Sequence, residues 1–217
     1  MVVERAIAVR GGRISSFRRV TEARVQFGFP GIWRFEYAFH VPQWYRWTVF
    51  TSEQPHYYLW DGQTMRAAVG DRVVGIDASG RAPLRSHARW TAVTYLDALC
   101  DGTLPVRFVA RRASDSDETT VVLRLEGDRE DFELTFDRHL RLIEVVAPID
   151  MPPFGPGRLT TRFFDFRLSG GYLMPYRTRY RFDGVTLCDE ETISFTVNDD
   201  SLDLDTFRRP PNPDGVD

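Results

Sequence analysis

The sequence predicts a mainly β protein of the α+β class, with ten or so antiparallel strands in meander order, one main helix and a short N-terminal helix. Most of the chain alternates apolar and polar residues with a period of two, which is the spacing of a strand with one buried face. Only one long segment has apolar residues at helical spacing, and turn signals such as Asp61-Gly62 separate the strands at hairpin distance. This many antiparallel strands curl into a barrel or an open half-barrel, whose concave face a helix can cover.

The segment 32–62 is the richest in aromatic residues and is expected to form three consecutive strands. In the first strand, the apolar face is made of Trp33, Phe35, Tyr37 and Phe39. Pro42 ends this strand because proline has no N–H to donate. The next strand, 43–51, has Tyr45 and Trp47 on one face and Trp44 and Phe50 on the other. A strand with two apolar faces is either covered on both sides or lines a ligand cavity.

The remaining elements follow in chain order. The expected helices are 2–9, which Gly11-Gly12 ends, a short second one at 14–17, and the main helix 84–99, with Pro83 in its first turn and Gly102 just past its end. The other expected strands are 21–29, 56–60, 64–68, 73–76, 106–110, 119–126, 132–136, 140–146, 159–168, 176–182 and 185–197. The prolines and glycines of 148–157 predict a loop that carries Met151 and Phe154 outward. Residues 1–207 are expected to form a single domain, and 208–217 a disordered tail.

Composition excludes several classes of protein. The chain has 217 residues, and its net charge of −3 is too small to indicate a nucleic-acid partner. No stretch reaches the roughly 20 apolar residues of a membrane-spanning helix, so no integral membrane segment is expected. Met1 is followed by Val-Val-Glu-Arg and not by an apolar leader, which predicts a cytoplasmic location as the sequence stands, and a periplasmic or envelope location if a leader has been removed.

Few residues show the spacing that chemistry requires. The four histidines are scattered, and neither a G-x-S-x-G elbow nor a phosphate-binding glycine loop is present, so no metal and no cofactor are expected. Asp165, between Phe164 and Phe166, is the one weak catalytic candidate, as a buried general base. The favoured alternative is an ion pair of Asp165 with a neighbouring arginine. Cys100 and Cys188 are expected to remain unbonded to each other, with Cys188 on the polar face of its strand, away from the core.

Turn residues and aromatics recur in an order that resembles a known superfamily. They are Gly11-Gly12, Pro42 with Arg46 four residues on, Asp61-Gly62, Phe164-Asp165-Phe166-Arg167, Gly170-Gly171, Pro175, Gly184, Val197-Asn198, Leu202-Asp203, Phe207 and Pro210. Over Val3 to Pro210 this order resembles the LolA/LolB-like lipoprotein carriers. The resemblance implies an open half-barrel whose concave face is covered by helices as a lid, and which encloses a hydrophobic cavity for acyl chains. Arg46 matches the arginine of a P-x-x-x-R pattern in the carriers, which implies a place for it at the cavity.

Two functional hypotheses follow. The first is non-enzymatic binding or carriage of an apolar ligand, such as a lipid, an acyl chain or a lipoprotein. Its expected ligand-binding residues are Trp33, Phe35, Tyr37, Tyr45, Arg46, Trp47, Trp60, Met151 and Phe154. For the aromatic residues the alternative is plain core, and for Arg46 it is stacking on surface aromatics. The second hypothesis is an intracellular enzyme of small-molecule metabolism on the same scaffold, and a protein-interaction or sensor domain is a third possibility.

Overall fold

The computed structural model describes residues 2–27, 29–41, 44–76, 78–100, 102–113, 117–126, 131–151 and 154–211. Pro42, the expected end of the first aromatic strand, and residues 212–217 of the expected tail lie outside these ranges.

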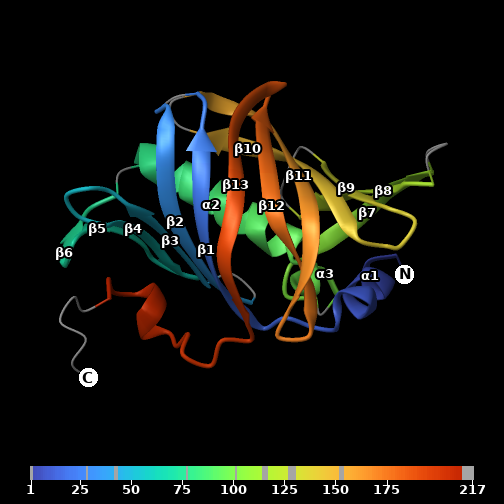
Figure 1. The fold of residues 1–217 in the computed structure, drawn as a ribbon, viewed down its shortest axis with the longest axis horizontal. Coiled ribbons are helices and arrows are strands. Elements are labelled where there is room, and N and C mark those ends of the chain that lie inside the picture. Colours follow the sequence, from blue (N-terminus) through green and yellow to red (C-terminus); the bar gives the residue numbers. More distant parts are fainter. Residues whose placement is uncertain are drawn as a thin grey trace.

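One antiparallel sheet contains all the strands of the described residues, as Figure 1 shows. Its first half is a meander of β1 (Ser16–Val25), β2 (Gly31–His40), β3 (Trp44–Phe50), β4 (His56–Asp61), β5 (Met65–Val69) and β6 (Arg72–Val74). Its second half is a meander of β7 (Val106–Ala113), β8 (Thr119–Leu125), β9 (Phe132–Phe136), β10 (Leu142–Met151), β11 (Gly155–Ser169), β12 (Tyr172–Phe182) and β13 (Val185–Val197). The two halves are joined where β1 pairs with β13.

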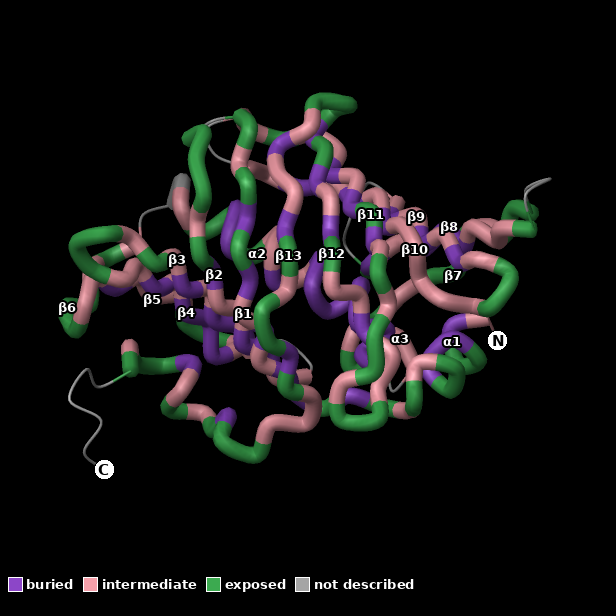
Figure 2. Tube along the Cα trace, viewed as in Figure 1, coloured by how far each residue is buried: buried purple, intermediate pink, exposed green. Residues whose placement is uncertain are grey.

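The sheet is curved and does not close, because β6 and β7 form its two ends without pairing to each other. The prediction of a mainly β, open antiparallel half-barrel is therefore confirmed. The sheet has thirteen strands, against the ten or so expected. Figure 2 shows that burial is concentrated in the centre of the molecule and decreases towards these two ends.

Helix α2 (Ala78–Thr94) crosses the concave face, and α1 (Val2–Arg10) and α3 (Asp97–Cys100) lie at one end of it (Figure 1). The main helix begins earlier than expected, so that Pro83 lies inside it, where a proline removes one backbone hydrogen bond. The helix is interrupted before α3, where Leu96 has a left-handed φ of 67°. The prediction of a short helix at 14–17 is wrong, because β1 begins at Ser16.

Two sides of α2 pack against the two halves of the sheet. Trp90 and Val93 belong to a hydrophobic cluster with residues of β8 to β13. Leu84, Ala88 and Ala92, four residues apart, belong to a second cluster with aromatic residues of β1 to β4. Residues four apart share one face of a helix, and the small alanine side chains leave room for the large rings opposite.

Residues 148–151 and 155–157 belong to β10 and β11 and not to the expected loop, whereas residues 152–153 lie outside the described ranges. Met151 pairs with Gly155 across a hairpin whose strands contain Pro148 and Pro156. Phe154 was expected to point outward. Its ring instead packs 5.1 Å from that of Phe27 and 5.7 Å from that of Phe182. Met151 likewise packs against the cluster of β8 to β13. The hairpin forms because proline is tolerated where its missing N–H is not needed by the ladder.

Residues 198–211, the C-terminal segment, cover the convex face of β2 to β4. Phe207 and Leu202 are buried against Ala38 and Trp44. Arg208, the first residue of the tail expected to be disordered, donates a hydrogen bond to Asp61. The convex face of this half is therefore covered by the chain itself.

Replacement of Phe207 should weaken the packing of the C-terminal segment on the sheet and destabilise the protein. The side chain is fully buried, so Phe207→Ala should lower the free energy of unfolding by about 3–5 kcal/mol. The measurement is urea denaturation followed by circular dichroism. Leu168→Ala, at a position that is 74% exposed, is the control and should change it by about 0.5 kcal/mol or less. Equal stability of the two variants would show that the segment contributes little.

Candidate functional site

Five of the sequence-predicted residues come together on the concave face, under α2. Trp47 pairs with Tyr37, and Tyr45 pairs with Trp60, so their side chains project to the same side of the sheet. The ring of Trp47 stacks on that of His87 in α2, with centroids 5.6 Å apart, and Phe35 lies 5.8 Å from Trp47. The concave aromatic wall, as we call this group, consists of Phe35, Tyr37, Tyr45, Trp47 and Trp60.

The other predicted residues lie elsewhere. Trp33 is at the outer end of β2, where its indole N–H donates to the carbonyl of Phe29. Met151 and Phe154 belong to the opposite half of the sheet. Arg46 lies on the convex face: it is buried, donates to Glu36, and is within 3.4 Å of the Thr206 carbonyl in the C-terminal segment. This position differs from the place at the cavity that the resemblance implied, and from the surface stacking of the alternative.

A buried polar cluster occupies the centre of the concave face. Glu190, 1% exposed, accepts hydrogen bonds from the hydroxyls of Tyr37 at 2.6 Å and Tyr180 at 3.0 Å. Its carboxylate lies 3.5 Å from the guanidinium of Arg19. Arg19 also donates to Thr192 and Thr178. The Glu190 cluster therefore consists of residues from β1, β2, β12 and β13.

The two tyrosines of this cluster are held in the protonated form. Burial raises the pKa of Tyr37 and of Tyr180 well above the ordinary tyrosine value, and the negative charge of Glu190 raises it further. Both hydroxyls therefore act as donors to a charged acceptor, an arrangement in which hydrogen bonds are strong.

Sequence reasoning missed this cluster because two bulges change which side chains face inward. The register of β13 shifts beside Tyr180 and again beside Val20, and a bulge reverses the alternation of a strand. Cys188 and Glu190 therefore point to the interior, so the expectation that Cys188 lies away from the core is wrong. Burial raises the pKa of the Cys188 thiol. Cys100 and Cys188 are not bonded to each other, as expected.

Arg19 could have been found from the sequence. It has the same parity in β1 as Phe17, Thr21 and Ala23, all of which are buried. A charged residue on the apolar face of a strand indicates a buried partner. The predicted strand began only at residue 21, which left Arg19 outside it.

Asp165 forms the ion pair that was favoured over a catalytic role. Its carboxylate accepts two hydrogen bonds from Arg167 and is exposed. These bonds lower the pKa of Asp165 below its ordinary value, whereas a general base at neutral pH needs a raised one. Among the described residues no group of three or more His, Cys, Asp or Glu side chains could hold a metal ion.

The interface between α2 and the sheet leaves polar atoms without partners. The indole N–H groups of Trp47 and Trp90 and the hydroxyls of Thr94 and Thr161 are buried, with no hydrogen-bond partner in the described part of the chain. Each such group costs roughly 1–3 kcal/mol. The helix therefore covers the sheet with good apolar packing but with incomplete polar pairing.

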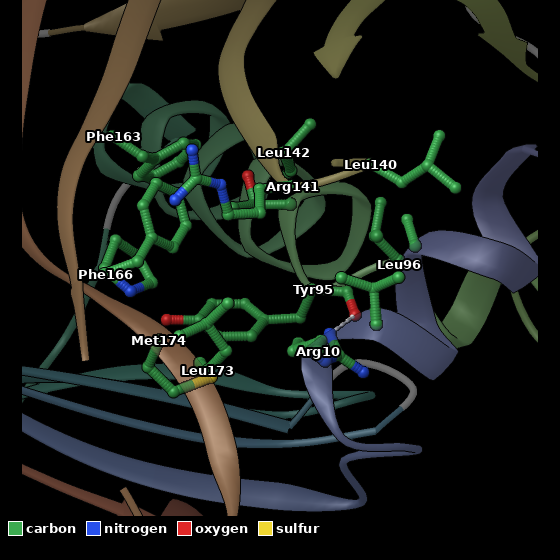
Figure 3. A pocket seen from close by; sticks show the side chains of 14 residues that line it. Arg10, Tyr95, Leu96, Leu140, Arg141, Leu142, Phe163, Phe166, Leu173 and Met174 are labelled. Carbon is green, nitrogen blue, oxygen red and sulfur yellow. Dashed lines mark hydrogen bonds between the residues drawn. The ribbon is translucent and has the colours of Figure 1, made fainter. Parts of the chain in front are cut away.

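A small cavity lies at the end of α2, as Figure 3 shows. It has a volume of about 50 Å³, and its lining is mostly apolar. The side chains come from α1, the α2–α3 junction, the turn before β10, and β10 to β12. None of the sequence-predicted binding residues lines it.

The fold and this site define an open half-barrel whose concave face is covered by one helix. The chain matches no protein-family model and no curated protein. It is similar to the crystal structure of a LolA superfamily protein from Nitrosomonas europaea, with a TM-score of 0.54, 13% identity and 95% of each chain covered. It is also similar to a DUF1329 family protein from Desulfovibrio piger, with a TM-score of 0.58, 10% identity and the same coverage. The protein thus has a LolA-like fold. None of its described helices has the length and apolar character to span a membrane.

Removal of one charge from the Glu190 cluster should destabilise the protein strongly. Glu190→Gln leaves Arg19 buried without its counter-charge, which should cost about 3–5 kcal/mol of unfolding free energy. The double variant Arg19→Met, Glu190→Gln should lose less than the sum of the two single variants. Urea denaturation of all three measures this coupling. Asp165→Asn, in an exposed pair, is the control and should change the free energy of unfolding far less. An equally small loss for Glu190→Gln would contradict the role assigned to the cluster.

His87 should make the packing of α2 sensitive to acid. Burial of its ring against Trp47 lowers the pKa of His87 to about 4, so below pH 6.5 the unfolded chain binds a proton that the folded protein does not. Stability should fall as the pH is lowered from about 6.5 to about 4. The difference between wild type and His87→Gln in thermal unfolding at several pH values measures this contribution. His139→Gln, in an exposed turn, should follow the wild type, and identical curves for His87→Gln would refute the assignment.

Proposed function

We propose that the protein binds and carries an apolar ligand with an acyl or similar alkyl chain, without catalysis. The ligand occupies the space between α2 and the concave aromatic wall. The observation that carries this proposal is the convergence of five large aromatic side chains from β2, β3 and β4 under one helix. The LolA-like fold supports it, since the similar structure from Nitrosomonas europaea is named for that superfamily.

The ligand needs α2 to move, because the helix fills the concave face in this structure. Burial of each methylene contributes about 0.8 kcal/mol, so a long chain can replace the packing of the small residues Ala88 and Ala92. The unpaired indole N–H groups of Trp47 and Trp90 support such an exchange. They would gain partners from ester or carboxylate oxygens of the ligand, or from water once α2 moves.

A lipoprotein as cargo is a narrower form of the same proposal. It requires acyl chains to enter the same space while the polypeptide stays outside. The enzyme alternative has no comparable support, since its candidate Asp165 is exposed and paired with Arg167.

Trp47 and Trp44 provide a matched test of the binding face. They are on the same strand, but Trp47 faces α2 whereas Trp44 packs on Phe207 on the convex side. Trp47→Ala should weaken binding of the fluorescent fatty acid cis-parinarate by about tenfold or more, equivalent to at least about 1.4 kcal/mol. Fluorescence titration measures the affinity, and circular dichroism confirms folding.

Trp44→Ala should leave the affinity within about twofold of wild type, a difference of about 0.4 kcal/mol. Equal affinities of the two variants would remove Trp47 from the binding face. Failure of the wild type to bind cis-parinarate, together with no lipid found by native mass spectrometry of purified protein, would overturn the carrier proposal itself.

A further inference from the structure

The cavity at the end of α2 is lined by two residues with an unusual backbone conformation. Six described residues other than glycine have a left-handed φ, and four of them are Asp or Asn, which tolerate this conformation. The other two are Leu96 with φ 67° and Leu140 with φ 62°, and both line the cavity. A left-handed φ is sterically unfavourable for a residue with a bulky side chain. Such strain concentrates at sites that hold a ligand.

The walls of the cavity are fixed by polar contacts behind them. Arg10, at the end of α1, donates to the carbonyl of Tyr95 at 2.6 Å (Figure 3). It also donates to Asp97 at 2.8 Å. These bonds join α1 to the α2–α3 junction that contains Leu96. On the other side, Arg141 pairs with Asp137 and lies over the ring of Phe166, 5.2 Å from its centroid. These contacts fix the positions of both arginines beside the cavity.

The chemistry of the lining selects an apolar occupant. The volume of about 50 Å³ corresponds to roughly three to five water-sized volumes. Water is disfavoured in an apolar cavity because it finds too few hydrogen-bond partners. The polar exceptions in this wall are the buried, unpaired hydroxyl of Thr94 and the side chains of Arg10 and Arg141, which are bonded to other groups. A narrow apolar space of this size fits the end of a straight alkyl chain.

The wall of the cavity is shared with the packed interior that α2 covers. Tyr95 and Met174, on its wall, belong to the same cluster as Tyr45 and Trp60 of the aromatic wall. The ring of Tyr95 stacks on that of Phe17 with centroids 4.1 Å apart. A chain that enters here thus reaches the end of α2 and the edge of its contact with the sheet.

We infer that this cavity is the portal through which the end of an alkyl chain enters, before the chain passes between α2 and the concave aromatic wall. The inference rests on the proposed function and adds to it the route of loading. The alkyl chain is shared by free fatty acids and membrane lipids, so both sources are tested.

Two substitutions on α1 separate the portal from a general effect on the helix. Val9 lines the cavity and is 45% exposed, whereas Ala8 is exposed and does not line it. Val9→Trp should slow the association of cis-parinarate at least tenfold in stopped-flow fluorescence, because the indole covers the opening. Ala8→Trp should associate at the wild-type rate. Leu173→Trp, at a half-buried position on the opposite wall, is a second blocking variant with the same expected result.

A direct readout uses palmitate with a diazirine at its terminal carbon, supplied either free or as an acyl chain in phosphatidylcholine vesicles. Brief photolysis after mixing should place adducts on peptides containing 94–96, 140–142 or 173–175. An adduct from either source supports the portal, and the source that gives it is identified as the donor of the alkyl chain. Unchanged association in both blocking variants, or early adducts only on β3 and β4, would overturn the portal while the carrier proposal stands. No binding by the wild type would overturn both.

Discussion

Arg19 and Glu190 bury opposite charges at the seam between the two halves of the sheet. Removal of both charges from water is costly, and their attraction compensates only when the remaining donors and acceptors are also paired. Tyr37, Tyr180 and two threonines provide that pairing. Because the six residues come from four strands, their hydrogen bonds fix the register at which β1, β2, β12 and β13 curve together. The apolar clusters on either side, and the helix that joins them, depend on this register.

Helix α2, which covers this seam, has fewer of its buried polar groups paired than the seam itself. Helix α2 packs two rows of side chains against two different clusters, yet it buries indole and hydroxyl groups without partners. Proteins retain such destabilising features where function needs a less stable arrangement. In the proposed carrier, the well-paired sheet provides the rigid frame, and the incompletely paired helix provides the part that gives way to a ligand.

The sequence predicted the parts of this protein that depend on local pattern. The alternation from Trp33 to Phe39 predicted that Phe35, Tyr37 and Phe39 share one face of β2, because a one-sided strand shows its apolar face directly. The inward orientation of the Cys188 and Glu190 side chains was not predicted, because bulges in β13 change the alternation of the strand without a distinct residue signal. The start of α2 was placed too late because Pro83 was taken as a helix start. The end cavity could not be predicted, since its lining comes from segments as distant as Val9 and Met174.

The strand order also constrains how the chain can be made. The last strand, β13, lies between β1 and β12, so the first and last strands of the chain are neighbours at the middle of the sheet. Each meander can form hairpin by hairpin during synthesis, but the two cannot be joined until the final strand has left the ribosome. Until then β1 exposes an unpaired edge of ten residues, and such an edge can pair with other chains. The pairing of β13 with β1 thus closes an exposed edge in the middle of the sheet, which no earlier strand covers.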